Sequence, residues 1–201
     1  MKILSFDVGI YNLAFANIDL DLDLDKNVDK SLQIKIKDWG ILCLKDKDKD
    51  TKKIDLNAIT KTLISVLYER FSEQTFDIVL IENQPCMKNP TMKSIQMIVY
   101  TFFMMQSHLE GREIDVKFVS ASNKLKVKHK CDVSAIVANT KNKYTVNKKV
   151  VVEYARNYLN LTNTGIGQGN GHWINLFEKE KKKDDWADAL CQAIHYIENH
   201  L

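Results

Sequence analysis

The sequence predicts one α/β domain over residues 1–201, built from a mixed five-stranded sheet flanked by helices. Three apolar runs near the N-terminus are separated by turn residues, a pattern typical of an antiparallel meander. Two more short apolar runs follow segments of helical periodicity, which favours strands joined by helices. The chain has 45% hydrophobic and 27% charged residues, which is ordinary for a globular protein with one core.

The meander strands are predicted at Lys2–Phe6, Leu13–Leu20 and Ile34–Leu44. Acidic residues and leucines alternate from Asp19 to Asp25, which could be mistaken for a calcium loop. No glycine lies where such a loop needs its turn, so we expect a hairpin arm with one face in water. Lys45–Lys53 is expected to be a charged loop.

Periodic apolar residues predict helices in the rest of the chain. The predicted helices are 55–72, Pro90–Leu109, 147–160 and 183–198, and the predicted strands are Asp77–Ile81, ending at Glu82, and Asp115–Val119. Asn89 is expected to cap the second helix, with proline in its first turn. Gly165–Gly171 does not match a dinucleotide-binding motif and is predicted to be a flexible loop.

The distribution of charge points to a polyanionic partner. Residues 116–201 contain 14 Lys and Arg against 8 Asp and Glu, whereas residues 1–115 contain 15 against 18. A local excess of lysine suits phosphate binding, although lysines on solvated loops would give the same composition. We expect no membrane span and no signal peptide, because long apolar runs and a secretory pattern are both missing. The four cysteines are widely spaced, which favours reduced thiols in an intracellular protein.

Four acidic residues stand where the predicted fold would bring them together. Asp7 closes the first strand, Glu82 closes the fourth, and Asp185 and Asp188 share one face of the last helix. Carboxylates gathered in one place repel each other unless cations neutralise them, and Mg²⁺ and Mn²⁺ prefer oxygen ligands. Two such ions can promote phosphodiester hydrolysis. Asp184 also shares a face with Asp188, so it stays open as a substitute for Asp185 or as an outer group.

Three motifs resemble those of RuvC-type Holliday junction resolvases. They are Asp7-Val-Gly-Ile-Tyr-Asn-Leu-Ala14, Ile81-Glu82-Asn-Gln84-Pro85 and Asp185-Trp-Ala-Asp188-Ala-Leu190. The stretch from Glu82 to Gln96 is most similar to the poxvirus-type resolvases of large DNA viruses, and the mitochondrial resolvases of fungi are similar more distantly. Related members often carry a basic residue where this chain has Asn83, so the resemblance carries no phosphate contact over to that position.

The resemblance implies an RNase H-like fold and an endonuclease that makes symmetric nicks in four-way DNA junctions. It implies two Mg²⁺ ions, replaceable by Mn²⁺, on Asp7, Glu82, Asp185 and Asp188. The DNA contacts that we infer are Asn12, Gln84, Lys124, Lys148 and Lys149. A viral member would act in the host cytoplasm. The run from Lys179 to Lys183 is equally consistent with DNA contact and with a solvated loop.

The resemblance and the two-fold symmetry of a junction also imply a homodimer. The helix Pro90–Leu109 is our predicted interface, with Phe103 inside it, because its centre is apolar nearly all round. The alternative is that helices 55–72 and 147–160 cover this helix within one chain.

Other functions remain to be weighed against junction cleavage. A nuclease acting on RNA or an RNA–DNA hybrid would use the same acids, and their spacing cannot separate the two substrates. An actin-like ATPase would need a second Asp-x-Gly hairpin and a longer chain, neither of which this sequence has. A DNA-binding module without catalysis would not need four converging acids.

Overall fold

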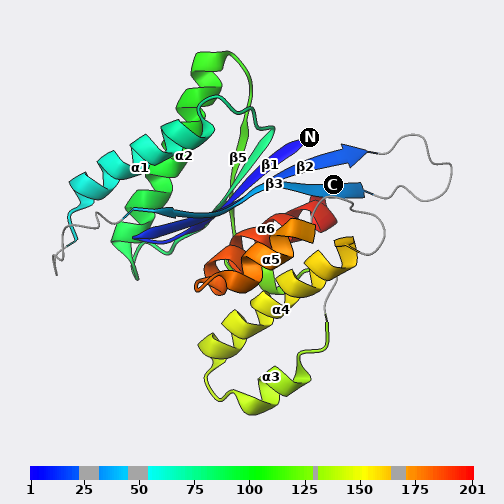
Figure 1. The fold of residues 1–201 in the computed structure, drawn as a ribbon. Helices are drawn as coiled ribbons and strands as arrows, with labels where there is room; N and C mark the ends of the chain where they lie inside the picture. Colours follow the sequence, from blue (N-terminus) through cyan, green and yellow to red (C-terminus); the bar gives the residue numbers. More distant parts are fainter. Residues whose placement is uncertain (23–31, 45–53, 129–130, 164–170) are drawn as a thin grey trace.

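The computed structural model describes residues 1–22, 32–44, 54–128, 131–163 and 171–201. Five strands form one mixed sheet in the order β3-β2-β1-β4-β5. Strand β1 pairs antiparallel with β2 and parallel with β4, while β2–β3 is antiparallel and β4–β5 is parallel (Figure 1). The predicted mixed sheet flanked by helices is therefore confirmed. The strands are β1 Lys2–Val8, β2 Asn12–Leu22, β3 Leu32–Cys43, β4 Ile78–Glu82 and β5 Asp115–Val119.

The β2–β3 hairpin arm is confirmed in its described part. Its pairing runs from Asn12 opposite Cys43 to Leu22 opposite Leu32, with an irregularity in register at Asn17/Ile18. The rest of the acidic arm, residues 23–25, lies outside the described residues, as do residues 45–53 of the charged loop and residues 164–170 of the glycine-rich segment.

The predicted helices are present, with boundaries shifted by a few residues. The helices are α1 Leu56–Phe71, α2 Pro90–Glu110, α3 Ser134–Asn139, α4 Lys143–Asn163, α5 Gly171–Lys179 and α6 Lys183–His200, and the 3₁₀ turn η1 spans Asn123–Leu125. Asn89 caps α2 as predicted, since its side chain accepts a hydrogen bond from the Met92 amide at 3.2 Å. Helix α4 begins earlier than predicted because Asn142 accepts from the Tyr144 amide at 2.9 Å. The short helices α3 and α5 were not predicted.

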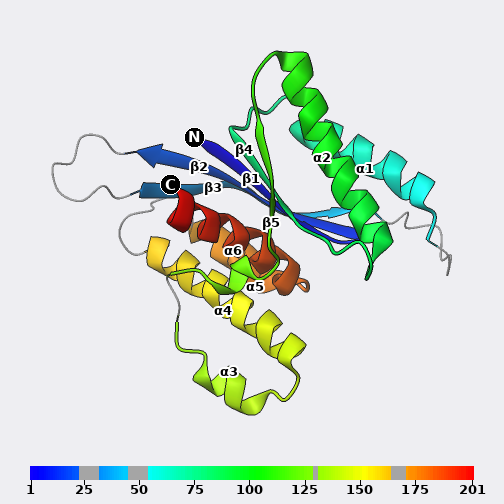
Figure 2. The same cartoon turned by 180° about the vertical axis from the view of Figure 1, so that it is seen from behind.

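The helices form two layers on opposite faces of the sheet (Figures 1 and 2). Helices α1 and α2 cover one face, where Phe6, Phe71, Phe76 and Phe103 pack as a cluster of aromatic rings. Helices α4, α5 and α6 cover the other face, which buries a second core. Three tryptophans and a phenylalanine stack in that second core: Trp39, Trp173, Trp186 and Phe177.

Helix α2 is buried on one side and exposed on the other. Phe103 is fully buried against the sheet, so our placement of this residue in a subunit interface is wrong. The alternative was that helices 55–72 and 147–160 both cover this helix within one chain. Only the first of them does, because α1 packs on α2 while α4 lies on the opposite face of the sheet. Met105 and Leu109 remain exposed on the outer side. The sequence of α2 is apolar on all sides of the helix, so it did not show which side would be buried.

Candidate active site

The parallel pairing of β1 with β4 places Asp7 beside Glu82. Phe6 lies opposite Ile81, and the next residue on each strand is the acid. Side chains alternate between the two faces of a sheet. Leu4, Phe6 and Val8 face α1 and α2, and Asp7 therefore faces the layer that contains α6. The same alternation along β4 directs Glu82 to that face.

Helix α6 brings the other two acids to the same place. Asp185, Asp188 and Gln192 are spaced i, i+3 and i+7, so they share one face of the helix. Gln192 is buried and its Nε2 donates to Ser5 Oγ at 3.0 Å and to the Phe6 carbonyl at 3.2 Å. These two bonds fix α6 against β1 one turn beyond Asp188. Gln192 was not predicted, although a polar residue at a core-facing helical position indicates a buried hydrogen bond.

A lysine lies at the centre of the acidic cluster. Lys124 Nζ is 2.5 Å from Asp188 Oδ2, 3.4 Å from Asp7 Oδ1 and 3.7 Å from Glu82 Oε2. The lysine reaches this point because β5 ends beside Glu82, with Val119 opposite it, and the chain then turns into η1. Four elements, β1, β4, η1 and α6, therefore meet at one group of charged atoms.

Burial and mutual repulsion change the proton affinities of this cluster. Burial raises the pKa of Glu82, and so does the adjacent Asp7 carboxylate. Burial also raises the pKa of Asp188, with a further contribution from Asp7. Burial alone would lower the pKa of Lys124, but the charges of Asp7, Asp188 and Glu82 outweigh it and the net shift is upward. Lys124 therefore stays an ammonium ion, and the carboxylates gain from a positive charge among them.

Asp184 and Asp185 have different surroundings although they are adjacent. Asp184 forms an ion pair with Lys148 of α4. Burial would raise the pKa of Asp184, but the bond from Lys148 outweighs it and the pKa is lowered. Asp185 lies in the cleft with Asp7 and Asp188, and burial together with the charges of Asp184 and Asp7 raises its pKa. This placement favours Asp185 over Asp184 as a member of the cluster.

The acidic cluster lies in a cleft of about 700 Å³. Asp7, Glu82, Asp185, Asp188 and Lys124 all line it, as do the predicted DNA contacts Asn12, Gln84 and Lys148. Lys149 is elsewhere: it is exposed, it is absent from the cleft lining, and its Nζ bonds to Thr140 Oγ1 at 3.3 Å. Tyr144 and Asn147 at the start of α4 also line the cleft, and sequence reasoning did not single them out.

Gln84 is held within the protein. It is buried, its amide donates to Gln96 Oε1 at 2.7 Å, and its Nε2 lies 3.5 Å from the Val8 carbonyl. Lys93 Nζ also donates to Gln96 Oε1 and to Asn83 Oδ1, each at 3.2 Å. These bonds tie the segment after Glu82 to α2. Gln84 thus shapes the wall of the cleft, and its side chain already has a partner in the chain.

The turn that follows Asp7 depends on glycine. A Cβ atom at Gly9 would collide with the carbonyl oxygen of Asn12, so any other residue would push the β1–β2 connection outward. The Asp-x-Gly part of the first motif therefore has a steric cause. It keeps the rim of the cleft close to the acid it surrounds.

The carboxylates fit a metal site by their chemistry, although they do not form one ready-made. Within the described ranges, no three acidic, histidine or cysteine side chains have the arrangement of a formed metal site. Instead, oxygens of Asp7, Glu82 and Asp188 surround one cation, the Lys124 ammonium. Partly buried carboxylate oxygens that already surround a cation are the donors that Mg²⁺ and Mn²⁺ prefer.

Comparison with solved structures places this architecture among the RNase H-like folds of Holliday junction resolvases. The fowlpox virus resolvase in complex with its junction substrate has a TM-score of 0.60 at 17% identity, over 100% of this chain and 99% of that chain. The yeast mitochondrial resolvase Ydc2 gives 0.59 at 16%, over 97% and 78%. RuvC of Thermus thermophilus gives 0.53 at 11%, over 98% and 96%. At these identities the likeness establishes the fold, which is the one that the three motifs implied.

One relative is similar in sequence. An uncharacterized protein of Acanthamoeba polyphaga mimivirus, L451, is 33% identical over 154 residues, which are 74% of this chain and 35% of the mimivirus protein. The chain therefore spans about a third of the length of that relative. No family model matches the sequence. Among the described helices, none is long and apolar enough to cross a membrane.

Proposed function

We propose that this chain is a metal-dependent endonuclease that resolves four-way DNA junctions, with one nuclease domain over residues 1–201. The observation that carries the proposal is the convergence of Asp7, Glu82 and Asp188 on one cation in an open cleft, with Asp185 on the same wall. The fold supports the choice of substrate, because similar folds belong to Holliday junction resolvases and one of these is bound to its junction. The mimivirus relative supports a viral source, for which we propose action in the host cytoplasm.

The four carboxylates of the cleft are the residues that would hold the metal, Mg²⁺ or Mn²⁺. Divalent ions held there would supply Lewis-acid stabilisation of the oxygens that gain charge in phosphodiester hydrolysis. The chain itself contributes fixed positions: Asp7 and Glu82 lie on paired strands, and Gln192 holds α6 so that Asp188 faces them. Lys148 at the rim of the cleft would exchange its partner Asp184, whose side chain is 21% exposed, for a phosphate.

The basic residues near the cleft support a polyanionic substrate. Lys143 begins α4 and Lys182 directly precedes α6. Lys148, Lys181 and Lys183 line a second hollow beside the cleft. A strand of DNA that crosses the acidic cluster would therefore meet lysines on the side of α4.

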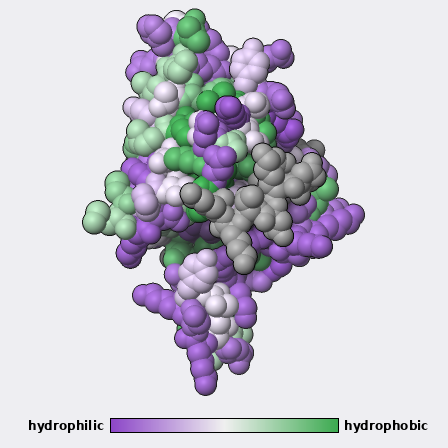
Figure 3. All heavy atoms as spheres, turned by 90° about the vertical axis from the view of Figure 1, so that its left-hand side faces the viewer, coloured by the Kyte–Doolittle hydropathy of each residue, from purple (hydrophilic) through white to green (hydrophobic). Residues whose placement is uncertain are grey.

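We also propose a homodimer, with the interface on the outer side of α1 and α2. The two helices enclose a groove of about 780 Å³ whose lining combines apolar side chains with polar ones such as Thr60 and Glu73. Hydrophobic side chains gather on this side of the molecule in Figure 3. The exposed members include Ile64, Tyr68, Met97, Met105 and Leu109. Such a patch on both copies can be buried by a two-fold axis, and the two cleavage sites of a junction call for two active sites.

Sedimentation at micromolar concentration tests the dimer. The double variant Met105→Glu, Leu109→Glu should shift the protein to monomers, because it places charges in the groove without touching the core. Leu161→Glu is the matched control, since Leu161 is an exposed leucine at the end of α4. A wild-type monomer that makes paired symmetric nicks would contradict the proposal.

Cleavage assays with three labelled substrates test the activity. A four-way junction, a linear duplex with the same sequence and an RNA–DNA hybrid are incubated with Mg²⁺, Mn²⁺, Ca²⁺ or EDTA. We expect symmetric cuts in the junction with Mg²⁺ or Mn²⁺, binding without cleavage with Ca²⁺, and no cleavage in EDTA. Preference for the hybrid would assign the same site to an RNA-directed nuclease. Full activity in EDTA would exclude the metal site.

A further inference from the structure

Lys124 has surroundings unlike those of any other described lysine. Its ammonium contacts three carboxylates, Asp7, Glu82 and Asp188, which come from three different elements. The side chains of these four residues are only 10–17% exposed. Lys148, the other lysine in this cleft, forms its ion pair with Asp184 and is more exposed. Lys124 is therefore the cation around which the acidic cluster is organised.

The charge balance of the cluster explains this position. Three neighbouring carboxylates repel each other strongly in a partly buried site, where charges interact more than they do in water. One ammonium offsets part of this repulsion. It thereby allows the acidic residues of β1, β4 and α6 to lie close together. A divalent ion would supply twice the charge and would need oxygen ligands at about 2.0–2.1 Å. The ammonium and a metal ion compete for these oxygens, because two cations held at the same carboxylates repel each other.

We propose that Lys124 is an exchangeable internal counter-ion, which occupies the space among the carboxylates without metal and leaves it when a divalent ion binds. This inference rests on the proposed function, because it assumes that the cluster binds metal. Lysine suits such an exchange, since its ammonium is a compact charge on a flexible four-carbon stem. Lys124 also lies on the short 3₁₀ turn η1, and its neighbours Ser122 and Leu125 line the same cleft.

The exchange couples metal binding to DNA binding. Once released, the ammonium stays tethered at the cleft, where a phosphate of the substrate can take the place of the carboxylates. Metal loading therefore adds one cationic contact for DNA, and DNA binding favours the metal-loaded state by the same free energy. A lysine that stayed in its ion pairs would produce no such coupling.

Calorimetric titration with Mn²⁺ and with Mg²⁺, in the absence of DNA, tests the exchange. Lys124→Met removes the competing charge and keeps the length of the side chain, so we expect about tenfold tighter metal binding. Lys124→Arg should bind metal like the wild type or more weakly. Lys148→Met is the matched control and should change the affinity much less, because Lys148 pairs with Asp184 outside the cluster. Thermal melts should show Lys124→Met less stable than the wild type in EDTA and restored by metal.

Salt dependence of junction binding, in Ca²⁺ and in EDTA, tests the release. In Ca²⁺, Lys124→Met should lower the slope of log K against log salt by about one unit relative to the wild type, and in EDTA the two slopes should agree. An equal loss of slope in both conditions, or unchanged metal affinity of Lys124→Met, would overturn the inference and leave the proposed function intact. If no variant binds a divalent ion, the metal site itself fails, and both proposals fail with it.

Discussion

The two faces of the sheet are built on different principles. The face under α1 and α2 is closed by apolar side chains, with four phenylalanines packed ring against ring. The face under α4, α5 and α6 is apolar only in part, because Asp7, Glu82 and Asp188 stand at one end of its core. Strand alternation is the cause of the division: within β1, Phe6 points to the first face and Asp7 points to the second.

The face under α1 and α2 contributes to stability, whereas the acidic end of the other face is suited to chemistry. Apolar packing on the first face lowers the free energy of the folded state and tolerates no charge. The carboxylates on the second face repel each other, which raises the free energy of the folded state. A cluster that costs stability persists because its geometry is needed for something else. Variants on the first face should therefore change folding, and variants at the acidic end should change activity.

Loss of a cluster carboxylate should have the largest effect. Asp7→Asn, Glu82→Gln, Asp185→Asn and Asp188→Asn are each expected to reduce junction cleavage about a thousandfold or more, on the order of 4 kcal/mol, while junction binding stays or tightens. Binding derives from lysine–phosphate contacts, which these variants leave in place. Single-turnover cleavage and a gel-shift titration in Ca²⁺ measure the two effects separately.

Asp184→Asn provides the control for these variants. Its side chain pairs with Lys148 and lies outside the cluster, so its cleavage rate should fall far less than that of Asp185→Asn. Equal losses for Asp184→Asn and Asp185→Asn would mean that both acids serve the metal site.

The two sides of α2 should respond differently to the same kind of truncation. Phe103→Ala removes a fully buried ring that contacts Phe6, Phe71 and Phe76, and it should lower the free energy of unfolding by about 3–5 kcal/mol. Met105→Ala, on the exposed side, should change it by less than about 1 kcal/mol. Urea unfolding at a protein concentration that favours monomers compares the two. Similar losses would show that the outer side of α2 is also covered.

Sequence reasoning located the acids because their positions follow from local rules. Strand ends and i, i+3 spacing are visible in the sequence, and they brought Asp7, Glu82, Asp185 and Asp188 to one cleft. The direction of Phe103 was not visible, because a helix that is apolar all round has no periodic face. The position of Lys124 was not visible either. Its place among the acids depends on where β5 ends and how η1 turns, which are tertiary facts.

Removal of Glu82 should change how stability depends on pH in EDTA. Burial and the neighbouring Asp7 raise the pKa of Glu82 to about 9, above its ordinary value of 4.5. A carboxyl group with a raised pKa destabilises the fold as pH rises from the unfolded value toward the folded value, because only the unfolded chain ionises freely. The stability of Glu82→Gln relative to the wild type should therefore increase between pH 5 and pH 9, by at most about 1.4 kcal/mol per pH unit.

Urea unfolding of both proteins in EDTA at several pH values measures this difference directly. Groups that titrate equally in the two proteins cancel in the comparison. A difference that is flat with pH would mean that Lys124 already neutralises the Glu82 charge. A difference of opposite sign would mean that the Glu82 carboxylate is a stabilising partner of the lysine.

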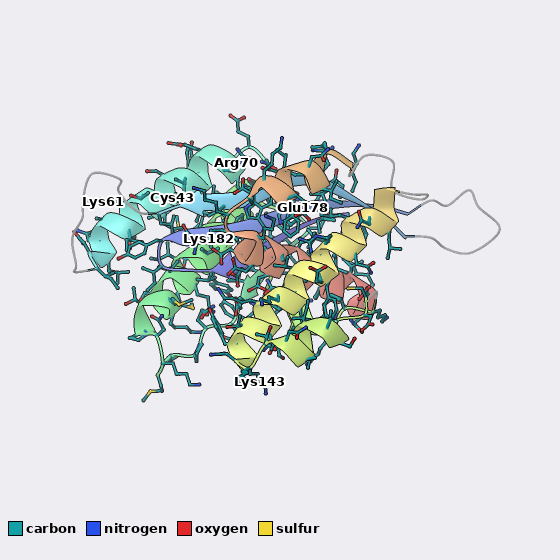
Figure 4. All side chains as sticks on the ribbon, turned by 60° about the horizontal axis from the view of Figure 1, so that its bottom comes forward. Cys43, Lys61, Arg70, Lys143, Glu178 and Lys182 are labelled. Carbon is teal, nitrogen blue, oxygen red and sulfur yellow. The ribbon has the colours of Figure 1, made fainter. Side chains whose placement is uncertain are left out.

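The smallest expected effect concerns a single phosphate contact at the rim of the cleft. Lys148→Ala should lower the slope of log K against log salt by about one unit for junction binding, because one fewer counter-ion is released. The matched control is Lys61→Ala on α1, which lies far from α4 in Figure 4 and should leave the slope unchanged. Lys149→Ala tests how far the contact surface extends, since Lys149 does not line the cleft and its Nζ bonds to Thr140. Titrations at four salt concentrations in Ca²⁺ give the slopes. If Lys61→Ala and Lys148→Ala flatten the slope equally, DNA covers both faces of the sheet, and the division between a packing face and a substrate face does not hold.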